Sequence, residues 1–100
     1  MILVTLFWLL FAHFLADYSL QNDWIAKKKI SDNYILLVHS FIWGGTVSLF
    51  LGYFGILMVW KVIFLIIGHF IMDYIKCRSK KDIWIIDQLV HFLQVLIILI

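Results

Sequence analysis

Hydrophobic residues dominate four long stretches of the chain, and short polar stretches separate them. The apolar stretches cover residues 2–20, 34–54, 56–76 and 83–100. Each approaches the roughly 20 residues that an α-helix needs to cross a bilayer. Proline is absent, so the usual helix breaker is missing from all four stretches. The pattern predicts an all-α fold, an integral membrane four-helix bundle, with residues 1–100 as a single transmembrane domain.

The composition points the same way. Hydrophobic residues make up 65% of the 100 residues, charged residues only 14%, and the mean hydropathy is +1.05. These values exclude an ordinary soluble domain. The first stretch contains His13 and Asp17 and has neither a basic beginning nor a small-residue cleavage site, so we expect a retained helix and no signal peptide. The net charge of +2 is too small to indicate nucleic acid as a partner.

The positions of the cations predict the orientation of the helices. The connection after the first stretch and the one after the third are basic, whereas the middle connection, residues 52–55, carries no charge. By the positive-inside rule, both basic connections lie in the cytoplasm. We therefore expect a multi-pass protein of the bacterial inner membrane. The basic residues of these connections are Lys27, Lys28, Lys29, Lys76, Arg78, Lys80 and Lys81.

A short segment of the chain occurs twice. Residues 13–18 read HFLADY and residues 69–74 read HFIMDY, while Val38-His39 recurs as Val90-His91. The chain thus reads as two helix pairs. The first and third helices run in the same direction, so the pattern predicts two parallel helix-pair repeats around an axis along the membrane normal.

Histidine and aspartate pairs mark the helices with a polar face. Three pairs have i, i+4 spacing, which puts both side chains on one face a single turn apart. Together with a further histidine, they fall in the predicted cytoplasmic halves of the four helices and can meet at one depth. These residues are His13, Asp17, His39, His69, Asp73, Asp87 and His91.

Such a cluster needs compensation inside a membrane. One aspartate near the bilayer centre costs about 3 kcal/mol on insertion scales, so three require pairing, water or a cation. Imidazole and carboxylate ligands without thiolate suit zinc, manganese, iron or nickel. We expect all seven residues to bind one or two divalent metal ions. The alternatives are a proton-linked site and hydrogen-bonded pairs that hold the helices together.

Other polar and small residues suggest contacts with partners. Gly44, Ser48 and Gly52 form a small-residue stripe, which could support a homodimer or pack against a neighbouring helix of the same chain. Lys61 is expected to snorkel outward. Lys76 either snorkels to the interface or contacts an anionic substrate.

These residues also carry a family resemblance. The patterns are Ala12-His13 through Asp17, Leu20-Gln21, Asp23-Trp24 followed by lysines, His39, His69 through Asp73, and Asp87-Gln88 with His91. The sequence resembles a bacterial and phage family of small membrane proteins, the domain of unknown function 3307. The resemblance implies a polytopic fold and no particular chemistry. More distantly, the sequence is similar to membrane-bound metal-dependent hydrolases.

The preferred interpretation is a membrane protein whose cytoplasm-facing cluster binds one or two divalent metal ions, and as an enzyme it would be a metal-dependent hydrolase at the inner leaflet. The metal ion would acidify a water molecule, and a carboxylate among Asp17, Asp73 and Asp87 would be the general base. One alternative is a non-enzymatic module that binds or transports metal or protons. Another is a structural or phage-lysis-type oligomeric membrane protein. A small chain leaves little material for a substrate pocket, which weighs against the enzyme.

Overall fold

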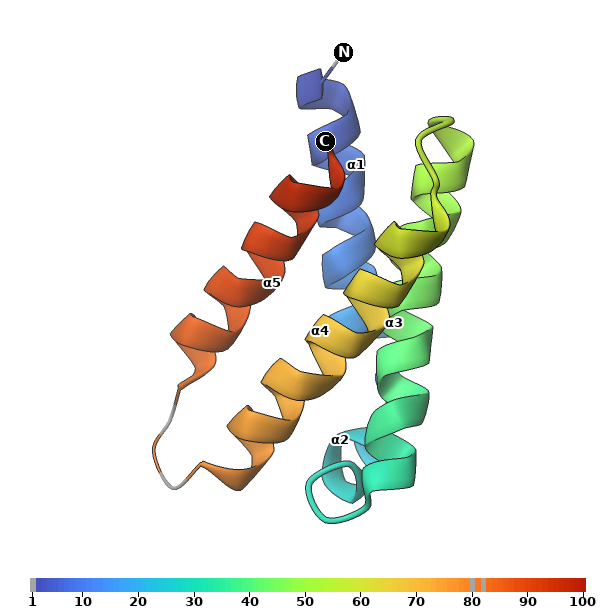
Figure 1. Cartoon of the computed structure of the whole chain (residues 1–100). Coiled ribbons are helices and arrows are strands. Elements are labelled where there is room, and N and C mark those ends of the chain that lie inside the picture. The colour runs from blue at the N-terminus through green and yellow to red at the C-terminus, as the bar shows by residue number, and fades with distance from the viewer. Residues whose placement is uncertain (1, 80, 82) are drawn as a thin grey trace.

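The computed structural model describes residues 2–79, 81 and 83–100, and within them all regular secondary structure is helical (Figure 1). This confirms the predicted all-α class. Lys80 and Asp82 lie outside the described residues. The elements in chain order are α1 (Ile2–Phe14), η1 (Leu15–Ser19), α2 (Asp23–Lys28), α3 (Asn33–Tyr53), α4 (Val59–Arg78) and α5 (Trp84–Ile98).

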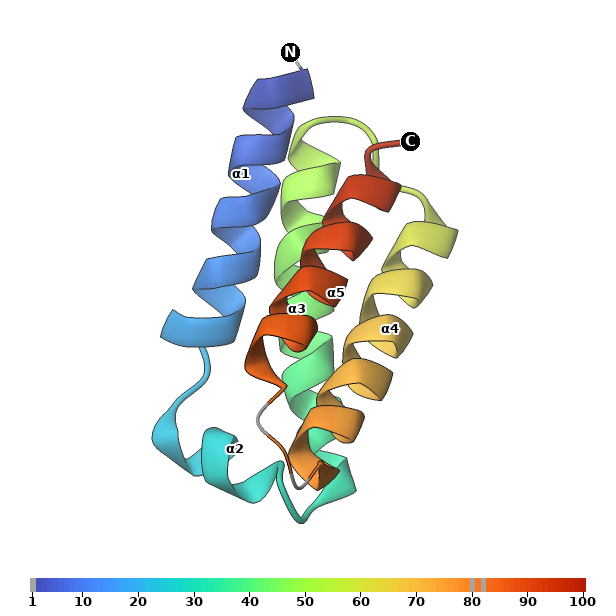
Figure 2. The same ribbon diagram turned by 90° about the vertical axis from the view of Figure 1, so that its left-hand side faces the viewer.

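The four long helices lie side by side and alternate in direction (Figures 1 and 2). The N-terminal end of α1, the connection between α3 and α4 and the C-terminal end of α5 share one end of the molecule. The short helix α2 and the connection between α4 and α5 share the other end. The basic connections are therefore on one side of the molecule and the uncharged connection on the other.

The first helix differs from its expected form. Instead of an α-helix that continues to residue 20, α1 ends at Phe14 and the chain continues as the π-helical turn η1, closed by a 2.9 Å hydrogen bond from Leu20 N to Leu15 O. The side chain of Gln21 donates to Asp17 O and supports this turn. Widened turns of this kind occur frequently at functional sites.

The helix α2 was not expected from the sequence, because its six residues are too few for a periodicity signal. It begins where the Asn22 side chain accepts a 2.8 Å hydrogen bond from Ile25 N, which caps the first turn. The chain leaves α2 at Lys29, which turns into the interior and is only 5% exposed. One lysine of the predicted topology signal thus contributes to the interior of the protein.

The small-residue stripe packs within the chain at two of its three positions. Gly44 and Ser48 are buried, whereas Gly52 is exposed. A Cβ atom on Gly44 would lie 2.4 Å from Ile66 Cγ1 and 3.4 Å from the Ile66 backbone, so α3 and α4 approach closely at this glycine. These positions thus favour the intramolecular alternative over a dimer contact.

The interior combines an apolar core with a polar cluster. Buried apolar side chains come from η1 and all four long helices: Leu9, Ala12, Ala16, Trp43, Val47, Leu51, Leu65, Val95 and Ile98. Lys61 is also buried and donates a 2.9 Å hydrogen bond to Ile56 O, so the expectation that it snorkels outward is wrong. Ile56 O, in the connection between α3 and α4, is thus a hydrogen-bond partner for the Lys61 ammonium group in the absence of bulk water.

Two described segments have the length and composition of a membrane span: Ile2–Ser19 and Asn33–Tyr53. The helix α5 is apolar but shorter, and α4 carries Lys61, Asp73 and Lys76. Large hydrophobic side chains nevertheless lie exposed on every long helix, among them Leu3, Leu49, Val59 and Leu93.

Candidate functional site

All seven predicted site residues are buried, none of them more than 9% exposed. They come from η1 and all four long helices, and neighbouring rings lie close together. The ring centroids are 4.9 Å apart for His39 and His69, 4.2 Å for His69 and His91, and 5.7 Å for His13 and His91. The i, i+4 pattern therefore marked side chains that share the interior.

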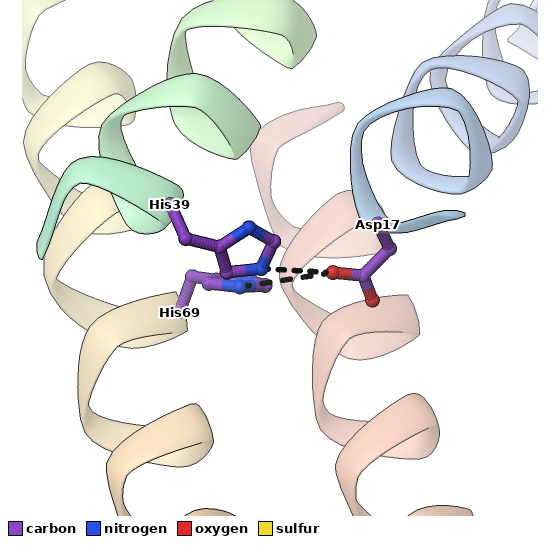
Figure 3. Close-up of side chains that lie close together, drawn as sticks. All are labelled: Asp17, His39 and His69. Atoms are coloured by element: carbon purple, nitrogen blue, oxygen red, sulfur yellow. Dashed lines mark ion pairs between the residues drawn. The ribbon is translucent and has the colours of Figure 1, made fainter. Parts of the chain in front are cut away.

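Asp17, His39 and His69 form a first group that could bind a metal ion, here called the first ligand group (Figure 3). The Asp17 carboxylate points toward both imidazoles, with Oδ1 3.3 Å from His39 Nε2 and 3.8 Å from His69 Nε2. Tetrahedral zinc with bonds of about 2.0–2.1 Å separates its ligand atoms by about 3.3 Å. The group thus has nearly the dimensions of a coordination sphere, with the carboxylate and imidazole donors that first-row divalent metals accept.

The imidazoles of this group lack hydrogen-bond partners. Among the described residues, no group forms a hydrogen bond with either ring nitrogen of His39 or of His69. The His69 ring packs against other rings instead, since it stacks on Trp43 at 4.5 Å and on His91 at 4.2 Å, and these two rings also lie 5.3 Å apart. A buried polar atom without a partner costs free energy, and binding of an ion is a recognised way to satisfy one.

Asp17, Asp87 and His91 form a second ligand group that shares Asp17 with the first. Asp87 Oδ1 lies 3.0 Å from His91 Nε2. The other ring nitrogen, His91 Nδ1, contacts Gln94 Oε1 at 2.9 Å and must carry the proton of that hydrogen bond. In the neutral ring, Nε2 therefore presents its lone pair to the carboxylates.

The orientation of Gln94 follows from its contacts with α4. Its Nε2 donates to the backbone carbonyls of Phe64 and Leu65, which turns Oε1 toward His91. A Cβ atom on Gly68 would lie 2.2 Å from Gln94 Nε2, so the missing side chain at Gly68 makes room for the amide. Gln94 was not predicted to belong to the site, although its i+3 spacing from His91 was a signal.

His13 lies in the cluster but has partners on both ring nitrogens. Trp43 Nε1 donates to His13 Nδ1 at 2.9 Å, so the proton of the neutral ring is on Nε2 and is donated to Gln88 Oε1 at 3.0 Å. Gln88 Nε2 in turn donates to Asp17 Oδ2 and to Asp87 Oδ2. In this arrangement His13 orients Gln88, and Gln88 holds the two carboxylates.

Asp73 is engaged by lysines. Its Oδ2 accepts a 2.8 Å hydrogen bond from Lys29 Nζ, and its Oδ1 lies 3.2 Å from Lys76 Nζ. Lys76 also lies 3.4 Å from Asp87 Oδ2. Lys76 thus points into the site, and the expectation of a purely snorkelling side chain is wrong. Asp73 Oδ2 is still only 3.6 Å from His39 Nε2, beside the first ligand group.

Gln88, Trp43 and Lys29 also belong to the site, although sequence reasoning assigned none of them a role there. Gln88 had a weak signal, since it follows Asp87 directly. Trp43 is four residues after His39, but an aromatic residue in an apolar helix is usually core. Lys29 had none, because its contact with Asp73 joins residues 44 positions apart.

Comparison with known proteins identifies the family. No curated protein and no solved structure matches the chain. The model of a family described as Protein of unknown function (DUF3307) matches residues 5–100, a range that includes all the site residues. The chain therefore belongs to this family, as its residue patterns predicted.

Proposed function

We propose that the protein is embedded in a membrane and that its four long helices span the bilayer. Exposed hydrophobic side chains on every long helix and charged groups in the interior support this proposal. A soluble monomer rarely exposes continuous apolar patches larger than a few hundred Å². Ionisable groups inside a membrane protein face the bundle interior and pair with one another, as Lys29 and Asp73 do here.

We further propose that both basic connections face the cytoplasm, with the bacterial inner membrane as the location. The arrangement of the helices supports this, because it puts these connections at one end of the molecule (Figure 1). The cations then lie on the side that the positive-inside rule requires. The buried cluster is nearer to this end, since His39 lies in the second turn of α3.

The function that the site supports best is binding of a divalent metal ion by Asp17, His39 and His69. The observation that carries this proposal is the convergence of buried imidazole nitrogens without hydrogen-bond partners on one carboxylate oxygen. Lipid offers these nitrogens no partner, and a cation would occupy the gap between them. His13, Gln88 and Gln94 would orient the surrounding groups without binding the ion.

The charge balance favours one ion over two. The three carboxylates and the ammonium groups of Lys29 and Lys76 leave one net negative charge when the imidazoles are neutral. One divalent ion changes this to one net positive charge, and two divalent ions would give three net positive charges. A site in a low-dielectric environment disfavours the larger excess charge. We therefore propose that Asp87 and His91 remain outside the coordination sphere.

Zinc titration of the purified full chain tests this proposal. We expect about one zinc ion per chain, and zinc at 100 times its Kd should add about 2.7 kcal/mol to the free energy of unfolding. His39→Ala and His69→Ala should abolish binding, whereas His91→Ala should retain it. Ser48→Ala, a buried change away from the cluster, is the control for packing effects.

The rival proposal, that protons balance the carboxylates, gives a different result. In that case zinc, manganese and chelators leave stability unchanged, and Asp17→Asn retains or increases the free energy of unfolding because it resembles the protonated acid. This outcome would overturn the metal site. Loss of zinc binding in Ser48→Ala to the same extent as in His39→Ala would overturn the choice of ligands.

Hydrolysis is the reaction that such a site supports. A bound divalent ion would supply Lewis acidity and acidify a water molecule. Asp87 Oδ1 and His91 Nε2, which lie 3.0 Å apart in the interior, would accept its proton. Zinc-loaded protein should then hydrolyse 4-nitrophenyl phosphate at a rate that falls about 100-fold or more in Asp87→Asn, with zinc binding retained. An unchanged rate in this variant would exclude Asp87 as the base.

A further inference from the structure

A groove of about 370 Å³ between α1 and α5 reaches the polar cluster from the side of the molecule. Its walls are apolar and include Leu10, Phe14, Leu89 and Phe92. Its lining also includes the imidazole of His13 and the amide of Gln88, together with Tyr18 and Trp84. A larger groove of about 520 Å³ lies between α1 and α3, and it differs because its lining contains no acid, amide or imidazole.

The polar lining of the groove is hydrogen-bonded to the proposed metal site. Gln88 accepts from His13 and donates to Asp17 Oδ2 at 3.3 Å and to Asp87 Oδ2 at 3.0 Å. Gln88 is half-buried, while Asp87 behind it is fully buried. A polar group that enters the groove therefore meets His13 and Gln88 before it reaches the carboxylates and the metal ligands.

The surroundings of the groove and the charge of the site indicate what the groove binds. Its rim consists of helix faces with exposed apolar side chains, such as Leu89 at 57% exposure, which in a membrane contact lipid chains. The metal-free site has one net negative charge and would repel an anion. With one divalent ion the site becomes positive, so it would attract an anionic head.

We propose that this groove binds a membrane lipid with a phosphate headgroup, whose acyl chain lies against the apolar walls and whose phosphate reaches the metal ion past Gln88. This inference rests on the proposed metal site and names the class of ligand that the site takes. Divalent ions and ammonium groups are common partners of phosphate oxygens, and Lys76 lies 3.4 Å from Asp87 Oδ2 at the same place.

Dodecyl phosphate is the probe, with the full chain in digitonin, a sterol-based detergent without a single alkyl chain. Isothermal titration should show that zinc-loaded protein binds dodecyl phosphate at least about tenfold more tightly than zinc-free protein, and about tenfold more tightly than it binds inorganic phosphate. Leu89→Trp, which fills the groove, should weaken binding about tenfold. Leu93→Trp changes the same residue type one turn further along α5 at 55% exposure, outside the groove lining, and should have no effect.

Three results would overturn the inference. In the first, Leu93→Trp weakens binding of dodecyl phosphate as much as Leu89→Trp does. In the second, zinc-loaded protein binds inorganic phosphate as tightly as dodecyl phosphate. In the third, it binds dodecyltrimethylammonium, which has the same chain and the opposite charge, as tightly as dodecyl phosphate. Zinc binding is measured in the same samples. If zinc binds and dodecyl phosphate does not, only the lipid groove fails. If zinc does not bind, the metal site and the groove proposal fail together.

Discussion

Histidines of the same buried cluster differ in what their ring nitrogens contact. His13 has Trp43 on one nitrogen and Gln88 on the other, whereas His39 and His69 have no hydrogen-bond partner among the described residues. A ring with two partners has a defined tautomer and no free lone pair. The difference separates a residue that positions others from residues available to bind an ion.

Trp43→Phe tests the role of His13. Phenylalanine keeps an aromatic ring against His69 but removes the N–H that donates to His13 Nδ1. A buried acceptor without its donor costs about 1–3 kcal/mol, and we expect the free energy of unfolding to fall by this amount. Denaturant unfolding in detergent measures it. Trp24→Phe, at a 57% exposed position, is the control and should change it by less than about 0.5 kcal/mol. Equal losses in both variants would show that the hydrogen bond does not matter.

At the scale of elements, close contact between α3 and α4 depends on one of two adjacent glycines. Gly44 faces Ile66, whereas a Cβ atom on Gly45 would meet nothing within 4 Å. Small residues at helix interfaces in membranes allow backbones to approach closely. Since α3 carries His39 and α4 carries His69, we expect this contact to affect the distance between the two imidazoles.

Gly44→Ala and Gly45→Ala therefore form a matched pair. Alanine at position 44 must displace Ile66, and we expect it to lower the free energy of unfolding by about 1–3 kcal/mol and to weaken zinc binding. Alanine at position 45 is unobstructed and should leave stability unchanged or raise it by up to about 1 kcal/mol, because alanine favours helix more than glycine does. Similar losses at both positions would mean that the helices do not meet at Gly44.

At the scale of the whole molecule, the two ends have different charge. One end has the basic residues around α2 and after α4. The other end has the uncharged connection between α3 and α4, the start of α1 and the end of α5 (Figure 2). This asymmetry makes orientation a testable property of the whole fold.

Cysteine labelling of intact cells measures the orientation. In a Cys77→Ser background, a membrane-impermeant maleimide added outside should label Phe54→Cys and leave Lys28→Cys unlabelled, because the basic connections face the cytoplasm. Permeabilised cells should allow both positions to react, which controls for reactivity. The opposite pattern in intact cells would reverse the orientation and place the proposed metal site near the outer face.

The sequence alone was sufficient for the all-α class, the approximate extent of the long helices, the family and the set of polar residues that share the interior. These properties follow from hydrophobic periodicity and from residue patterns, which are local along the chain. The π-helical turn at Asp17 and the helix α2 were not predictable in this way. Both are too short to produce a periodic signal.

Only the tertiary structure decided which polar residues partner one another. Gln88 contacts His13 from 75 residues away, and Lys29 pairs with Asp73 from 44 residues away. Such contacts depend on how helices pack and rotate against their neighbours, and the spacing within one helix does not contain this information. The sequence therefore placed seven side chains in one interior. Packing determined that Asp17, His39 and His69 come together as a candidate ligand group, that His13 contacts Gln88, and that Asp73 is paired with two lysines.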